Sequence, residues 1–529
     1  MRVTKLETYI HAYLSKEEMI SILYLALTIG FSIFVWIWLK RKRNFWKNFG
    51  VHTPPYSLIW GHFRTRYFQG GSPSQRVRII YDYVREKGLK YAGLYLLLDP
   101  WFVVVDLDLI KHILQSDFQH FTDKIFDEVE GEPLTGHLLC LKGQRWKLMR
   151  KKLTPAFSSG KMKMMFETFL ACTYTLREVM DQELSSPEID IKDILGRFST
   201  DLIGSCAFGI KCNSLKEPHN EFREMGKRSI QIPTRMISSI KQKLISISPG
   251  LMRMFNVRVI PQDAHDFFMD VVQNTIEYRE KYNVTRKDLM QILIDLKNRK
   301  KLVDDDEMMD EVITEEENTI SINEIAAQAY VFFVGGFETS ATVMTFCLYE
   351  LAKNPSIQDK VRQEILEVLK RHDGNLTYDT IMEMPYLEKV IFETIRKFPP
   401  STVSARTCTK DYKVPETEII LTKGMNIWIP TFGIHHDPKY YPDPEKFDPE
   451  RFSEENKKLR HDFSFLGFGE GPRMCIGKRL GLMKTKLGLT TLLRNYEFSL
   501  SNRTKEPFQW DPDTPVLSVV GNIWLKHKK

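Results

Sequence analysis

The sequence predicts a mainly α-helical protein with a small β portion and one transmembrane helix near its N-terminus. Most of the chain has the apolar spacing of amphipathic helices. Alternation typical of strands is confined to Tyr91–Val105 and to the neighbourhood of Met425–Pro430. A charge-free run over Ile20–Leu39 is the third observation behind this fold class.

The composition is that of an ordinary globular protein. Of 529 residues, 43% are hydrophobic and 27% are charged, and no Pro/Gly/Ser-rich linker divides the chain. The 75 basic and 68 acidic residues give a net charge of +7, too small to predict nucleic-acid binding. Seven cysteines without a C-x-x-C pair argue against a disulfide framework or a zinc ribbon and favour a reducing compartment. The one biased segment, residues 297–317, predicts a solvated loop.

The charge-free run Ile20–Leu39 is long enough to cross a bilayer, since 20 helical residues span about 30 Å. Trp36 and Trp38 mark its end, and Lys40-Arg41-Lys42-Arg43 follows directly. Five basic residues just after the run against three before it predict that the rest of the chain faces the cytosol. A cleaved signal peptide is the alternative, but its apolar region would be shorter and would end in small residues.

A second long helix is predicted from Ser321 to about Lys353. Ser321-Ile322-Asn323-Glu324 has the pattern of a capping box, and Asn354-Pro355 ends the helix. Acidic residues and two glycines within it argue against the alternative of a second membrane span. Its centre is Gly335-Gly336-Phe337-Glu338-Thr339-Ser340, where each glycine weakens the helix by about 1 kcal/mol. Such a cost makes sense if a ligand presses against the backbone there.

The most informative motif surrounds Cys475. Residues Phe468–Gly477 fit F-x-x-G-x-R-x-C-x-G at every fixed position, a match expected by chance in roughly one chain of this size in 10,000. The motif indicates a haem site in which the Cys475 thiolate ligates the iron. Glycines bring backbone N–H groups close to the sulfur, and a following helix, expected over Ile476–Leu493, favours its negative charge. Arg473 is expected to donate to a haem propionate, and a lone buried cysteine is the alternative reading.

With this motif the chain resembles the cytochrome P450 family over nearly its whole length. It is most similar to microsomal insect enzymes that metabolise foreign compounds (family 6, clan 3), with vertebrate drug-oxidising enzymes as more distant relatives. Phe118–Phe121, Lys152–Phe157 and Thr345–Leu351 carry this resemblance. It implies a membrane anchor over residues 1–45 and one haem-thiolate catalytic domain over residues 46–529. Of the usual proline-rich hinge after the anchor, only Pro54-Pro55 is present, without its glycine.

The resemblance also assigns roles within the long helix and around the cofactor. Thr339 would hydrogen-bond the bound oxygen and Glu338 would help to deliver protons, whereas a threonine bonded to the preceding turn is the structural alternative. Further cofactor contacts are implied for Trp146, Arg150, Arg406, Phe468 and Gly469. Substrate contacts are implied for Val331, Val334, Gly335, Ser401, Thr402 and Val403, and less directly for Thr135–Leu139.

A structural ion pair is implied for Glu393 and Arg396. Their spacing places both charges on one face of a helix expected over Tyr386–Lys397. In the family this pair is buried and joined by a later arginine, here Arg451, so that the charges satisfy one another. The expected role is to hold the cysteine loop in shape.

The implied activity is monooxygenation of a lipophilic substrate such as a plant toxin, an insecticide, or a hormone or pheromone precursor. Heme b is the implied cofactor. No G-x-G-x-x-G motif opens a strand-to-helix turn, and Gly471–Lys478 has the wrong glycine spacing for a P-loop. Electrons from NADPH would therefore arrive through NADPH-cytochrome P450 reductase, with cytochrome b5 as a further candidate partner, at the endoplasmic reticulum membrane. The alternatives are a haem-thiolate isomerase or dehydratase, which usually lacks the acid–threonine pair, and a non-catalytic haem-binding protein.

Two basic clusters are expected to form a docking face for an acidic reductase. They consist of Lys142, Lys147, Lys151 and Lys152 near Trp146, and of Lys478, Arg479, Lys484 and Lys486 after Cys475. A solvated helix face of no special role is the alternative. His435-His436 does not have metal-ligand spacing on a helix, so it is interpreted as structural.

Overall fold

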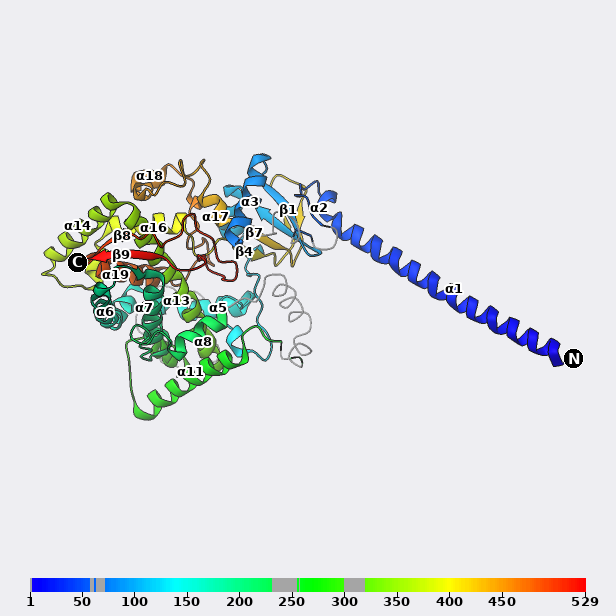
Figure 1. Ribbon diagram of the computed structural model, residues 1–529, viewed down its shortest axis with the longest axis horizontal. Helices are drawn as coiled ribbons and strands as arrows, with labels where there is room; N and C mark the ends of the chain where they lie inside the picture. Colours follow the sequence, from blue (N-terminus) through cyan, green and yellow to red (C-terminus); the bar gives the residue numbers. More distant parts are fainter. Residues whose placement is uncertain (1, 58–60, 63–71, 231–254, 256, 299–318) are drawn as a thin grey trace.

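The structure is a computed structural model that describes every residue except 1, 58–60, 63–71, 231–254, 256 and 299–318 (Figure 1). The segment predicted to be a solvated loop lies almost entirely outside the described residues.

Helices form most of the described chain, which confirms the predicted fold class. They are α1 Arg2–Arg43, α2 Phe45–Asn48, α3 Pro73–Glu86, α4 Leu107–Lys111, α5 Gly143–Leu153, α6 Ser159–Gln182, α7 Ile191–Ile203, α8 Glu221–Ile230, α11 Gln262–Tyr282, α12 Leu289–Lys297, α13 Ile322–Lys353, α14 Pro355–Arg371, α15 Tyr378–Met382, α16 Pro385–Lys397, α17 Thr431–His435, α18 Glu454–Lys458 and α19 Lys478–Leu493. Short 3-10 or π turns include η3 Pro133–Thr135, η6 Gly204–Phe208 and η7 Pro449–Phe452.

The main sheet has four strands in the order β1-β2-β7-β4. Strands β1 (Tyr91–Leu96) and β2 (Asp99–Val104) form an antiparallel hairpin, β2 pairs in parallel with β7 (Asn426–Ile429), and β7 pairs antiparallel with β4 (Ser404–Thr407). The two strand regions predicted from the sequence are therefore neighbours in one sheet. Two smaller sheets join β3 Ile189–Asp190, β9 Trp524–Lys528 and β8 Glu497–Leu500, and β5 Tyr412–Lys413 with β6 Ile420–Leu421.

Helix α13 is the central helix of the protein. The Ser321 hydroxyl accepts the Glu324 N–H at 3.2 Å, and the Glu324 carboxylate accepts the Ser321 N–H at 2.8 Å, so the predicted capping box is formed. Residues 325–333 and 340–352 are all buried, packed against helices that include α7, α11, α16 and α19. By length and composition α13 could cross a membrane. Its burial identifies it instead as a core helix and argues against a second membrane span.

Helix α1 projects away from the rest of the protein (Figure 1). By length and composition it could cross a membrane, and its apolar window is not buried by any other part of the protein. It is longer than the predicted span, since the helix begins at Arg2.

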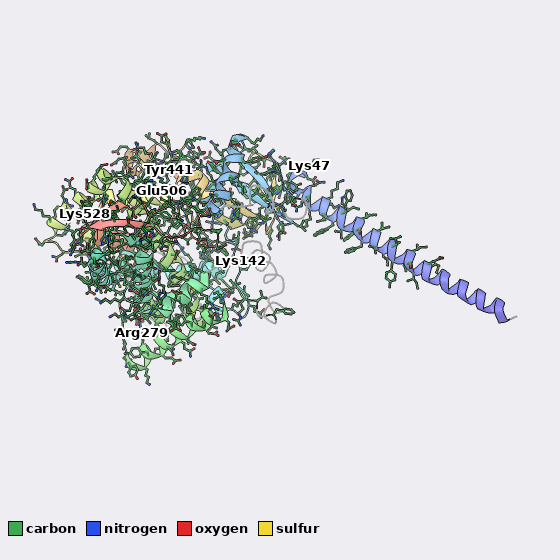
Figure 2. All side chains as sticks on the ribbon, viewed as in Figure 1. Lys47, Lys142, Arg279, Tyr441, Glu506 and Lys528 are labelled. Carbon is green, nitrogen blue, oxygen red and sulfur yellow. The ribbon has the colours of Figure 1, made fainter. Side chains whose placement is uncertain are left out.

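The C-terminal end of α1 is attached to the main sheet. Arg43 is buried, with its guanidinium carbon 5.2 Å from the ring centre of Tyr56 and 5.0 Å from that of Tyr95. The Tyr95 hydroxyl donates to the Arg43 carbonyl at 2.7 Å. Trp46 is buried against Gly93, where a Cβ would lie 2.3 Å from the indole. The Arg43 side chain therefore packs against the folded domain, whereas Lys47, four residues later, is exposed (Figure 2).

Helix α19 passes very close to α13 and α7 at Gly488. A Cβ on Gly488 would lie 2.6 Å from the Met344 sulfur and 2.9 Å from a ring carbon of Phe198. At Gly481, in the same helix, a Cβ would have no neighbour within 4 Å. The two glycines lie in the same helix but differ in the space around them, so an alanine at Gly481 is the matched control for an alanine at Gly488.

We predict that Gly488→Ala lowers the free energy of unfolding by roughly 1–3 kcal/mol, because the added methyl overpacks the contact. Gly481→Ala should be neutral or stabilising by up to about 1 kcal/mol, because alanine favours a helix over glycine. Chemical unfolding of both variants under one set of conditions measures the difference. Equal stability of the two variants would contradict the close contact at Gly488.

Candidate functional site

The loop around Cys475 is shaped by glycines and by the start of α19. The Cys475 N–H donates to the Phe468 carbonyl at 2.9 Å, and the N–H of Gly477 donates to the Cys475 sulfur. Gly469 and Gly471 have φ angles of +69° and +74°, and a Cβ on Gly471 would lie 1.7 Å from the Leu114 carbonyl oxygen. Only glycine fits at Gly471, so the motif's glycine spacing follows from this turn and this close approach.

Cys475 is accessible even though its thiol is poorly solvated. All seven cysteines are described and free, and Cys475 is the exposed one. Burial nevertheless raises the pKa of its thiol, while the Gly477 N–H and the positive charges of Lys124, Arg150 and Lys478 act in the opposite direction. A sulfur that is both accessible and poorly solvated suits a ligand that enters the protein interior.

The centre of α13 opens onto space. Over residues 325–352, a stretch that the structure describes completely, Gly335 is the one exposed residue. A Cβ at Gly335 would have no neighbour within 4 Å. Val334 beside it is half-buried and Val331, one turn earlier, is buried. The structure thus leaves room against the α13 backbone at the position where the sequence predicted that a ligand presses.

The other residues predicted to contact substrate lie in two segments near these helices. Gln328 of α13 accepts the Leu138 N–H at 3.0 Å and donates to the Gly136 carbonyl at 3.2 Å, so the segment Thr135–Leu139 is attached to α13. Ser401, Thr402 and Val403 form the connection from α16 to β4, and all three are at least partly exposed.

Trp146, Arg150 and Arg473 lie together beside the cysteine loop. The Arg473 guanidinium carbon is 4.1 Å from the Trp146 ring centre, and Arg150 donates to the Met474 carbonyl at 3.0 Å. Arg473 itself donates to the carbonyls of Thr122, Leu138 and Leu141 at 2.7–3.0 Å. Its side chain therefore joins the cysteine loop to the segment that precedes α5.

Four cations surround this part of the interior, and they fit the propionates of haem. Arg406, on β4, is 1% exposed, and its Nε has no hydrogen-bond partner. Burial lowers the pKa of Arg406 to about 10, and burial together with Arg406 lowers the pKa of Arg473 to about 9. Burial, together with the charges of Arg406, Arg473 and Arg150, lowers the pKa of Lys124 to about 7. A dianionic ligand would satisfy a buried guanidinium and oppose these shifts.

Lys124 was missed from the sequence. A lysine in a loop is most often solvated, and no motif surrounds it. Asp123, its neighbour in the chain, is the carboxylate that acts on Arg473. Only the fold shows that Lys124 faces Arg406 and Arg473, because these residues are far apart in the sequence.

Thr339 and Glu338 point in different directions from α13. The Thr339 hydroxyl donates to the Gly335 carbonyl at 2.6 Å, which is the bond to the preceding turn weighed as the structural alternative. Glu338 lines a cavity of about 210 Å³ with Lys192, Arg223 and other polar residues. Burial raises the pKa of Glu338, whereas the positive charges of Lys192 and Arg223 oppose this.

Glu393, Arg396 and Arg451 are brought together in the core. Arg396 binds the Glu393 carboxylate through two hydrogen bonds of 2.8 Å each, and the Arg451 Nε lies 3.4 Å from the same carboxylate. The N–H of Asp448 donates to Glu393 at 3.0 Å. The Glu393 and Arg396 side chains are fully buried.

His435 connects this ion pair to the cysteine loop. Its Nδ1 lies 3.2 Å from the Arg396 carbonyl, and its Nε2 accepts the Leu466 N–H at 2.8 Å. Burial lowers the pKa of His435 to about 3, which agrees with a neutral ring that donates from Nδ1. Among the described residues no group of acidic, histidine or cysteine side chains is arranged to hold a metal ion.

The prediction that both basic clusters lie on an exposed face is wrong for Lys484 and Lys486. Both are buried: Lys484 donates to the Gly336 carbonyl at 2.8 Å, and Lys486 lies 2.7 Å from the Glu388 carboxylate of α16. Of the other members, Lys142 (Figure 2), Lys147 and Arg479 are exposed, whereas Lys151, Lys152 and Lys478 are half-buried. Helix α19 packs into the core, so its later lysines find partners there.

Known proteins match this sequence over most of its length. The family model for Cytochrome P450 matches residues 54–520. Cytochrome P450 6A1 of Musca domestica is 41% identical over 494 residues, which cover 91% of this chain and 93% of that protein. Probable cytochrome P450 6a13 of Drosophila melanogaster is 39% identical over 519 residues (96% and 99%), and Cytochrome P450 6k1 of Blattella germanica is 36% identical over 494 residues (92% and 93%). The resemblance predicted from the sequence is confirmed, and the chain belongs to the cytochrome P450 family as a monooxygenase that binds haem b.

Proposed function

We propose that this protein inserts one atom of O2 into a lipophilic substrate, using electrons that NADPH supplies through NADPH-cytochrome P450 reductase and, additionally, cytochrome b5. The observation that carries this proposal is that Cys475 and Gly335 are both exposed to the space around them. Cys475 lies in the loop that leads into α19, and Gly335 lies on α13, which packs against α19. Apolar Val331 and Val334 lie beside Gly335 on α13, which favours an apolar substrate. Plant toxins, insecticides and hormone or pheromone precursors are the candidate classes.

We assign the haem to the space between Cys475 and Gly335. Cys475 would ligate the iron, and Phe468 and Gly469 would lie against the ring on the cysteine side. Trp146, Arg150, Arg406 and Arg473 would hold the propionates, and Lys124 joins them because it lies among the same cations. When bound, haem supplies the iron at which dioxygen is reduced and cleaved.

Thr339 and Glu338 would then handle protons. The Thr339 Oγ1 keeps lone pairs that can accept a hydrogen bond from water, and its own O–H can turn from the Gly335 carbonyl towards a ligand. Glu338 lines a cavity large enough for several waters, together with charged side chains such as Lys192 and Arg223. This pair distinguishes the proposal from a haem-thiolate isomerase or dehydratase and from a haem carrier, none of which needs a proton supply. NADPH-dependent oxygen consumption by the reconstituted protein separates the three.

We also place the protein in the endoplasmic reticulum membrane, anchored by α1 with the catalytic domain in the cytosol. Three exposed basic residues, Lys40, Arg41 and Lys42, follow the apolar run and support this orientation. Residues 1–45 are proposed as the anchor and 46–529 as the catalytic domain. The attachment of Arg43 and Trp46 to the main sheet gives this anchor a defined direction relative to the domain.

Replacing Cys475 tests the ligand assignment. The reduced carbon-monoxide complex of the wild type should absorb at the red-shifted position typical of thiolate ligation. Cys475→His should lose that band, because a neutral nitrogen donates less charge to the iron. Cys172→Ser, which alters a half-buried cysteine elsewhere, should keep it. A Cys475→His protein with the wild-type band would show that another residue is the ligand.

Replacing Thr339 tests the proton route. Thr339→Ala should keep the carbon-monoxide spectrum but lower product per NADPH by roughly tenfold, the effect of losing one hydrogen bond of about 1.4 kcal/mol. The missing electrons should appear as hydrogen peroxide. Thr339→Ser, which keeps the hydroxyl, should retain most of the coupling. Unchanged coupling in Thr339→Ala would remove Thr339 from the mechanism.

The exposed basic residues test the partner. Lys147→Glu combined with Arg479→Glu should raise the apparent KM for reductase, and activity should fall with added salt, because surface charges are screened beyond about 8 Å at physiological ionic strength. Peroxide-driven turnover should be insensitive to both changes. Lys423→Glu, an exposed lysine near the start of β7, is the control. If reductase-supported activity changes neither with salt nor in the Lys147→Glu/Arg479→Glu variant, the docking face lies elsewhere.

A further inference from the structure

Lys484 is a buried lysine to which the proposed mechanism gives no role. It lies on α19, is 1% exposed, and its Nζ donates to the Gly336 carbonyl of α13 at 2.8 Å. Burial lowers its pKa to about 8, opposed by the thiol of Cys206. No ion pair among the described residues includes it. An apolar side chain of similar length could fill this space without desolvating an ammonium, so what the ammonium adds is a directed hydrogen bond.

The acceptor of that bond belongs to an unusual turn of α13. Three successive carbonyls, those of Gly335, Gly336 and Phe337, each accept a hydrogen bond from a side chain. Thr339 donates to Gly335 at 2.6 Å, and Ser199 of α7 donates to Phe337 at 2.7 Å and to Gly336 at 3.2 Å. Added donors draw carbonyls away from the regular helical ladder and bend a helix locally. Glu338 and Thr339 follow directly in this turn.

Packing brings Lys484 to this carbonyl. Gly488, one turn further along α19, allows the close approach to Met344 of α13. Gly336 contributes in the same way, because a Cβ there would lie 3.0 Å from the Ile203 side chain and 3.5 Å from the Lys484 Nζ. Helix α19 begins three residues after Cys475. One rigid helix therefore runs from the cysteine loop to the carbonyl that Lys484 binds.

We propose that Lys484 is a positioning residue that holds the Glu338–Thr339 turn of α13 in a fixed place relative to the Cys475 loop. The bond acts through protein alone and so sets the separation of the two sides of the haem site before any ligand binds. This inference rests on the proposed role of Glu338 and Thr339 in oxygen activation. Without the bond the turn would move against α19, and proton delivery would compete less well with peroxide release.

The test compares Lys484→Met with Lys486→Met in the reconstituted holoenzyme. Both variants remove a buried ammonium from α19, but Lys486 pairs with Glu388 of α16 and not with α13. Lys484→Met should keep the carbon-monoxide spectrum and lower product per NADPH several-fold. Hydrogen exchange of the peptides that cover residues 335–342 should become roughly tenfold faster, because local opening has lost one hydrogen bond to a charged group. Lys486→Met should change neither quantity.

Lys484→Gln is the rescue variant, since its amide keeps a neutral donor on a shorter side chain. Its coupling should lie between those of the wild type and Lys484→Met. If Lys484→Met does not hold haem, Lys484→Gln is the deciding variant. We expect it to keep the carbon-monoxide spectrum and to lose part of the coupling, and wild-type coupling in this variant would contradict the proposal. Equal coupling and exchange in wild type and Lys484→Met, or the same losses in Lys486→Met, would overturn the proposal. A wild type that consumes no oxygen with NADPH and reductase would contradict the proposed function instead.

Discussion

The fully buried carboxylate of Glu393 is the constraint on which the site depends. Two bonds from Arg396, the nearby Arg451 and the Asp448 N–H satisfy it. Removing one partner of such a pair leaves an uncompensated charge, which costs about 3–5 kcal/mol. Arg396 also donates to the His435 carbonyl at 3.1 Å, and His435 in turn accepts the Leu466 N–H ahead of the cysteine loop. The position of the cysteine loop is thus fixed through a chain of directed bonds that begins at one carboxylate.

Short sequence motifs predicted those elements that interactions between neighbouring residues in the chain determine. The capping box of Ser321 and Glu324 placed the start of α13, and the glycine spacing around Cys475 predicted a loop that brings backbone N–H groups close to the sulfur. The strands β8 and β9 were not predicted, because they have four and five residues and pair with each other across a long stretch of chain. Lys484 and Lys486 were misplaced for a related reason. The partners that bury a lysine lie on other helices, and a single sequence does not reveal them.

The connection between the anchor helix α1 and the catalytic domain is also determined by tertiary contacts that no sequence motif indicates. The reduced proline-rich hinge left the orientation of the domain open. In the structure, Arg43 lies against the rings of Tyr56 and Tyr95, and Trp46 fills the space that Gly93 leaves on β1. A buried tryptophan and a cation packed on aromatic rings resist bending more strongly than a short loop would. The direction in which α1 leaves the domain therefore depends on residues of the sheet as much as on the linker.

The cations around the site connect cofactor binding to folding. A lysine whose pKa falls on folding destabilises the folded state at all pH values below its unfolded pKa, and burial lowers that of Lys124 from 10.5 to about 7. Arg406 and Arg473 are shifted in the same direction by burial. The two carboxylates of a bound haem would add anionic partners to these groups and return their pKa values towards normal. Haem incorporation should therefore stabilise the fold through electrostatics as well as through apolar contact, because its carboxylates would offset the cost of burying these cations.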